Sequence, residues 1–181
     1  MTSLDKFRFR YRSHVQYYRR AAFVKAFRSA RYIYGQHGGH LYIAIKSSFY
    51  VEISFIPRMV RECGGYMVSI GSKAENDFVY ALVEDEPAFF SVGRVTNAQV
   101  SYRNGPMIGL LKDKSGRWKW DSGEPLRYTN WERYQPNNER GKEIYTSLFA
   151  LRSGKDEMID VPADKWNDTC CSTHSYVLEF E

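Results

Sequence analysis

Side chains that end in oxygen atoms gather at two places in the second half of the chain. They are Gln135, Asn137, Glu143, Asn167 and Asp168. A set of ligands made only of oxygens suits a hard cation, and Ca²⁺ far more than Zn²⁺ or Cu²⁺. If the Gln135–Pro136 peptide bond is cis, the carbonyl oxygens of Gln135 and Asn137 can point to the same side. Spacing alone leaves two readings open, a calcium site and ordinary turn chemistry, in which Pro and Asn are common.

Short strands and two helices are expected to position these residues. One helix should begin near Pro57, since proline is tolerated in the first helical turn. Ser72 and Glu75 form a capping-box pattern that predicts a second helix to about Val83. Residues 112–142 predict one long loop, a feature that is usually functional. Strands are expected at residues 41–45, 66–70, 107–111, 144–151 and 175–180, and residues 88–105 predict a loop or an extra strand.

The charge of the chain is concentrated at its N-terminus. The 181 residues carry a net charge of +5, but residues 1–38 hold nine Lys and Arg against one acid, for +8, and residues 39–181 carry −3. Residues 14–34 contain no Gly or Pro and place aromatic side chains on one helical face, so they predict a helix. We therefore expect a basic helical arm over residues 1–38 and a separate body over residues 39–181. Packing of the arm on the body or on a partner is favoured over binding to nucleic acid or membrane.

The composition excludes several classes of protein. With 43% hydrophobic residues and three cysteines, the chain is neither disordered nor a disulfide scaffold. It has no apolar run long enough for a transmembrane helix, and its first residues do not form a secretory signal. No Ser/His/Asp, Cys/His or phosphate-loop pattern is placed for catalysis, so the chain is not expected to be an enzyme.

The order of several motifs resembles that of the C-type lectin-like domain family, from about residue 39 to the end of the chain. The matching segments are Gly64-Gly65-Tyr66-Met67-Val68-Ser69-Ile70, Glu75-Asn76, Met107-Ile108-Gly109-Leu110, Trp118-Lys119-Trp120-Asp121-Ser122-Gly123-Glu124-Pro125, Tyr128-Thr129-Asn130-Trp131, Gln135-Pro136-Asn137-Asn138, Glu143 and Trp166-Asn167-Asp168. The resemblance implies an α+β fold with two helices, two small antiparallel sheets and a long calcium-binding loop.

The resemblance also implies a ligand set. In sugar-binding members, five side chains hold Ca²⁺, and by position they are Gln135, Asn137, Glu143, Asn167 and Asp168, with the backbone carbonyl of Asp168 as a further ligand. Sugar hydroxyls then coordinate the ion and hydrogen-bond to the same five residues, because carboxylates accept and amide groups donate. Single-sugar affinity should be weak, so useful avidity would need several copies, for example in a homo-oligomer.

The Gln-Pro-Asn motif is a hybrid of two patterns in the family. In the family, Glu-Pro-Asn resembles the motif of mannose-selective members, and Gln-Pro-Asp resembles the motif of galactose-selective members. The aromatic, glycine-rich loop that galactose binders often carry after the motif is missing here. The chain is therefore expected to favour mannose-type sugars. Only Glu143 and Asp168 bring negative charge, which predicts weak calcium binding.

The chain departs from the family at its disulfide bonds. Val60 and Leu178 occupy the two positions that the family's long disulfide bond would join, as if a core contact had replaced it. Tyr145 and Cys171 occupy the two positions of the second disulfide bond, so Cys171 has lost its partner cysteine. The domain is thus expected to be disulfide-poor, although a bridge from Cys63 to one of the other two cysteines stays open. Missing bridges suggest a reducing compartment, whereas a calcium lectin is expected to be secreted or surface-exposed, so localisation stays open.

Three functions are weighed on this basis. The first is calcium-dependent carbohydrate binding. The second is a protein- or surface-binding module on the same fold, with calcium structural or absent, because a fold alone does not decide function. The third, least favoured, is binding of nucleic acid or membrane by the basic arm. The tryptophans at positions 118, 120, 131 and 166 are expected to lie in the core and to anchor the long loop.

Overall fold

The fold is α+β, as predicted. The computed structural model describes residues 30–95, 100–153, 162–170 and 172–181. These residues contain two α-helices, α3 (Ile56–Glu62) and α4 (Lys73–Ala81), and three 3₁₀ turns, Ile53–Phe55, Pro87–Phe89 and Glu139–Gly141. The strands are β1 (Arg31–His37), β2 (His40–Glu52), β3 (Tyr66–Met67), β4 (Ser91–Val95), β5 (Val100–Ile108), β6 (Leu110–Lys112), β7 (Trp118–Trp120), β8 (Tyr145–Ser153), β9 (Lys165–Thr169) and β10 (Ser172–Phe180). None of the described helices is long and apolar enough to cross a membrane.

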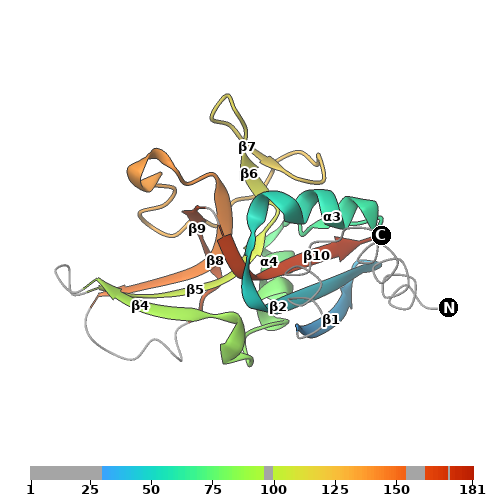
Figure 1. The fold of residues 1–181 in the computed structure, drawn as a ribbon, viewed down its shortest axis with the longest axis horizontal. Helices are drawn as coiled ribbons and strands as arrows, with labels where there is room; N and C mark the ends of the chain where they lie inside the picture. The colour runs from blue at the N-terminus through green and yellow to red at the C-terminus, as the bar shows by residue number, and fades with distance from the viewer. Residues whose placement is uncertain (1–29, 96–99, 154–161, 171) are drawn as a thin grey trace.

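Most strands form one large sheet. Its order is β1-β2-β10-β5-β8-β9, with β3 added to β10 and β4 added to β5, while β6 and β7 form a separate pair. The C-terminal strand β10 therefore lies in the middle of the sheet, and its pairing with β5 is parallel. In Figure 1, β6 and β7 project from one side of the large sheet, and the orange segment that contains residues 135–143 lies above β8 and β9.

The prediction of a helix over residues 14–34 is wrong for residues 31–34. Residues 31–37 form β1, which pairs antiparallel with β2, and residues 1–29 lie outside the described part of the chain. Gly38 and Gly39 have φ values of 58° and 89° and form the two-residue turn of the β1–β2 hairpin. The proposed boundary between residues 38 and 39 thus falls inside this hairpin.

Both helices begin where local signals predicted. Pro57 lies in the first turn of α3, and Ser72 is the N-cap of α4, where its hydroxyl accepts from the Glu75 N–H at 3.2 Å. The Glu75 carboxylate accepts from Gly71 N–H at 2.7 Å. Helix α4 ends at Ala81, two residues before the predicted end at Val83, with Leu82 as its C-cap.

The predicted strand over residues 107–111 is divided between two sheets. Strand β5 ends at Ile108 and β6 begins at Leu110, with Gly109 between them. The Gly109 N–H donates to Val68 O at 2.8 Å, and a Cβ at this position would lie 2.5 Å from Met67 O. Only glycine allows this close backbone approach, which turns the chain from the large sheet into the smaller one. Residues 88–105 contain β4 and the start of β5, so the extra-strand alternative is confirmed.

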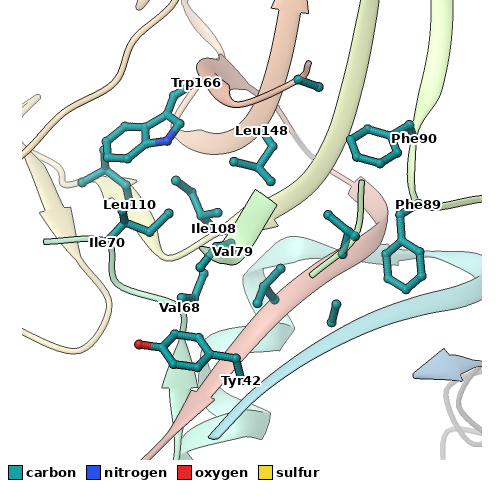
Figure 2. Close-up of a cluster of buried hydrophobic side chains, with 14 of the residues drawn as sticks. Tyr42, Val68, Ile70, Val79, Phe89, Phe90, Ile108, Leu110, Leu148 and Trp166 are labelled. Carbon is teal, nitrogen blue, oxygen red and sulfur yellow. The ribbon is translucent and has the colours of Figure 1, made fainter. Parts of the chain in front are cut away.

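Two buried clusters form the core. The first packs α4 against the sheet, and in Figure 2 Trp166 and Leu110 lie at one end of it and Phe89 and Phe90 at the other. The second lies around α3 and contains both Val60 and Leu178, each fully buried. The prediction of a core contact that involves these two apolar positions is confirmed. Cys171, the other departure, lies outside the described residues.

A buried carboxylate on β10 predicts a pH-dependent stability. Glu179 lies 2.6 Å from His40 Nδ1 and accepts from the Ser69 N–H at 3.0 Å, and burial raises its pKa above the ordinary value of 4.5. Because the folded state then binds the proton more tightly, this group stabilises the fold below pH 4.5, and that contribution is lost as pH rises through the raised pKa.

We therefore expect the free energy of unfolding of the wild type, relative to that of Glu179→Gln, to fall as pH rises from 4.5 toward 8. One group can contribute at most about 1.4 kcal/mol per pH unit. Urea denaturation of both proteins across this range measures the difference. A difference that does not change with pH would contradict the prediction.

Candidate functional site

The five predicted ligands come from one loop and one strand. Gln135, Asn137 and Glu143 lie on the long segment between β7 and β8. The predicted loop over residues 112–142 is wrong at residues 118–120, which form β7 and pair with β6. Asn167 and Asp168 are part of β9, a strand that was not among those predicted. They lie opposite Ser147 and Thr146 of β8, which begins two residues after Glu143. Antiparallel pairing of β8 with β9 therefore brings the second group of residues to the end of the loop.

Asp168 joins the strand to the loop. Its side chain is fully buried, and its two oxygens accept separate hydrogen bonds, from the Asn137 N–H at 3.0 Å and from the Asn138 N–H at 2.8 Å. Hydrogen bonds to an ionised carboxylate are stronger than those between neutral groups. The Asp168 carboxylate therefore fixes the middle of the loop against β9.

The other loop side chains are connected to this contact. The Asn137 Oδ1 and Glu143 Oε2 atoms accept from the same Glu139 N–H, at 2.9 and 2.7 Å, so these two oxygens lie close together. Gln135 Oε1 accepts from the Asn137 N–H at 3.2 Å. The Gln135–Pro136 peptide bond is cis, the geometry considered from the sequence. Hydrogen bonds thus connect Gln135, Asn137 and Asp168, and the Glu139 N–H links Glu143 to Asn137. Asn167 is adjacent to Asp168 on β9.

Sequence reasoning missed the structural role of Asn138. This residue has φ 49° and ψ 50°, in the left-handed region that Asn adopts more readily than most residues. Its Oδ1 atom accepts from the Glu143 N–H at 3.2 Å, and its carbonyl accepts from the Gly141 N–H at 2.8 Å. Asn138 therefore closes the loop between Asn137 and Glu143. The adjacent asparagines at positions 137 and 138 are the sequence signal that could have indicated a tight turn here.

Burial raises the pKa of Glu143, and the nearby charges of Asp168 and Glu139 raise it further, whereas the Glu139 N–H and Lys112 lower it. A bound cation would offset the repulsion between the two carboxylates. Among the described residues, no three His, Cys, Asp or Glu side chains lie close enough to hold a metal ion. A site here would thus depend on the amide oxygens of Gln135, Asn137 and Asn167 together with the two carboxylates, a donor set that fits Ca²⁺.

Aromatic packing beneath the loop holds its base. Trp166 is fully buried, and its indole N–H donates to Asn76 Oδ1 at 2.7 Å. Its backbone carbonyl accepts from the Glu132 N–H, and its N–H donates to Asn130 O, both at 2.9 Å. The rings of Trp120, Tyr128 and Trp131 lie 5.6–5.9 Å from the Trp166 ring. The prediction that the tryptophans belong to the core and anchor the loop is confirmed for this group.

Comparison with known families identifies the domain. Residues 60–178 match the family model of the Lectin C-type domain, over more than half of the chain and including every predicted ligand. The chain belongs to the C-type lectin family. Rat lithostathine is 32% identical over 120 residues, which are 65% of this chain and 58% of that protein. Bovine pulmonary surfactant-associated protein D is 28% identical over 119 residues, 65% of this chain and 24% of that protein.

The solved structure of human lithostathine has the same fold. It superposes with a TM-score of 0.60 at 20% identity, over 82% of this chain and 96% of that one. This C-type lectin domain covers less than two thirds of the length of the two curated relatives. The family consists of non-enzymatic carbohydrate-binding modules, which agrees with the prediction that the chain is not an enzyme.

Proposed function

We propose that this C-type lectin domain binds carbohydrate through a calcium ion held by Gln135, Asn137, Glu143, Asn167 and Asp168. The observation that supports the proposal most is the pair of hydrogen bonds from the Asn137 and Asn138 N–H groups to the Asp168 carboxylate. These bonds bring the loop and strand halves of an all-oxygen donor set together. Membership of a family of carbohydrate-binding modules supports it independently.

Each residue has a role that follows from its chemistry. Glu143 and Asp168 supply the two negative charges that balance Ca²⁺, and the amides of Gln135, Asn137 and Asn167 supply neutral oxygens. When bound, the ion would offer coordination positions to two neighbouring sugar hydroxyls. The carboxylate oxygens would accept hydrogen bonds from these hydroxyls, and the amide NH₂ groups would donate to them.

We propose that mannose-type sugars are preferred over galactose-type ones. The support is the Asn at position 137, which the mannose-selective pattern shares, and the absence of an aromatic, glycine-rich loop after the motif. Because only two carboxylates contribute charge, calcium affinity should be low, and because the loop residue Asn137 is exposed, single-sugar affinity should also be low. Several copies would then be needed for firm attachment to a glycoconjugate.

Calorimetric titration tests the calcium dependence. In about 5–10 mM CaCl₂, which is above the Kd range of about 0.1–1 mM of extracellular calcium modules, methyl α-mannoside should bind and methyl β-galactoside should bind less well. Addition of EDTA should abolish binding of both sugars. Sugar binding that persists in EDTA, or the absence of any calcium uptake at millimolar concentration, would contradict the proposal.

A further inference from the structure

An exposed tyrosine lies next to the proposed site. Six large hydrophobic side chains are exposed among the described residues, and Tyr134, at 64%, is the most exposed of them. It directly precedes Gln135, while Ile144, at 41% exposure, directly follows Glu143. Exposed apolar side chains therefore directly precede and directly follow the proposed calcium ligands of the loop, and neither side chain is a calcium ligand.

The backbone around Tyr134 is held in place. The Glu132 N–H donates to Trp166 O, and the Gln135 N–H donates to Glu132 O, both at 2.9 Å. Residues 132–135 thus form a turn attached to β9 at the residue before Asn167. A side chain on a turn that is anchored in this way loses little conformational entropy when it binds a ligand.

A charged side chain lies beside the Tyr134 ring. The guanidinium carbon of Arg133 lies 5.3 Å from the ring centroid, within the distance of a cation–π contact. This contact restrains the ring, and the side chain nevertheless remains mostly exposed to solvent. An exposed aromatic ring with a hydroxyl at its tip suits a ligand that is itself half apolar and half polar. A pyranose ring is such a ligand, since its C–H bonds form apolar faces and its hydroxyls form a polar edge.

We propose that Tyr134 is a second contact for carbohydrate, which binds the sugar residue adjacent to the one at the calcium site. This inference rests on the proposed function. The occupant follows from position, because the exposed Tyr134 ring directly precedes Gln135 and is therefore within reach of a sugar residue linked to the one bound there. The domain should therefore bind a mannose oligosaccharide more tightly than a single mannose.

The test compares methyl α-mannoside with a mannotriose, each titrated into the full chain in CaCl₂. Tyr134→Ala should weaken mannotriose binding about three- to tenfold, the loss of one aromatic contact, and change methyl α-mannoside binding less than twofold. Tyr134→Phe should keep most of the affinity. Tyr34→Ala is the matched control, because Tyr34 is 57% exposed and lies on β1, at the opposite edge of the sheet from β9.

Each outcome separates this inference from the proposed function. If Tyr134→Ala weakens the binding of both sugars equally, or of neither, Tyr134 is not a second contact. The binding of both sugars by the wild type still tests the calcium site separately. If the wild type binds neither sugar in CaCl₂, the proposed function fails, and the inference fails with it. Circular dichroism and calcium titration of each variant, which should match the wild type, exclude a folding or metal-binding cause.

Discussion

Replacement of Asp168 by asparagine should weaken calcium binding by about 100-fold or more, since even residues that only orient metal ligands contribute about 10- to 100-fold. Calcium-dependent sugar binding should be lost with it. The substitution keeps the size of the side chain and removes one of the two negative charges, those of Glu143 and Asp168, proposed to balance the ion. Calorimetric titration with CaCl₂ measures the first effect, and titration with methyl α-mannoside measures the second.

The same substitution should also loosen the loop in the absence of calcium. The two Asp168 oxygens each accept from a backbone N–H, those of Asn137 and Asn138. An asparagine side chain has only one oxygen, so its NH₂ group would face one of these donors. The Asn138 N–H would then lose its Asp168 acceptor, or the Asn137 N–H would keep only its 3.2 Å contact with Gln135 Oε1. A hydrogen bond to a charged group contributes about 1.5–3 kcal/mol, and urea denaturation in EDTA should show a loss of this order or less.

Glu139→Gln is the matched control for charge. Glu139 lies in the same loop, and its exposed carboxylate contacts the side chain of Arg140. If calcium affinity depends on the proposed ligands and not on the total charge of the loop, this variant should bind calcium within a fewfold of the wild type. An Asp168→Asn protein that binds calcium as tightly as Glu139→Gln would contradict the assignment of Asp168.

Replacement of Trp166 by alanine should destabilise the domain by about 3–5 kcal/mol. The side chain is fully buried, and three other aromatic rings surround it. Its removal also leaves the buried Asn76 Oδ1 without its donor. Because whole domains are stable by only about 5–15 kcal/mol, this loss is a large part of the total. Urea denaturation followed by far-ultraviolet circular dichroism measures it without relying on tryptophan fluorescence.

Two further variants separate the causes of that loss. Trp166→Phe keeps an aromatic ring but cannot donate to Asn76, so it should cost less than Trp166→Ala. Trp118→Ala removes a tryptophan that packs on Trp131 at the partly exposed margin of the same cluster, and it should cost less again. If Trp118→Ala were the more damaging change, the central role of Trp166 would be wrong.

Local patterns in the sequence were sufficient to predict several parts of the fold. Pro57 and Ser72 mark the starts of the two helices, and both signals act within one helical turn, so neighbouring residues decide them. The donor types of the proposed calcium site are also readable, because they depend only on which side chains carry oxygen. The ordered motifs were specific enough to indicate the family, which the match over residues 60–178 confirms.

Other parts depend on residues far apart in the chain. Residues 31–34 have a helical pattern by their neighbours, yet they form part of β1 because β2 supplies hydrogen-bond partners across the Gly38-Gly39 turn. Residues 107–111 have the pattern of one strand, yet Gly109 approaches the backbone of Met67 and Val68 so closely that the chain changes sheets there. In both cases long-range packing overrides local preference.

The candidate site shows the same division. The residue types alone indicate which side chains carry oxygen and that they stand at two separate places in the chain. The folded domain shows in addition that Asp168 lies on a strand, that β8 places this strand beside the loop, and that two backbone N–H groups join them. The type of a side chain is a local property, whereas its burial and its hydrogen-bond partners depend on which strands pair.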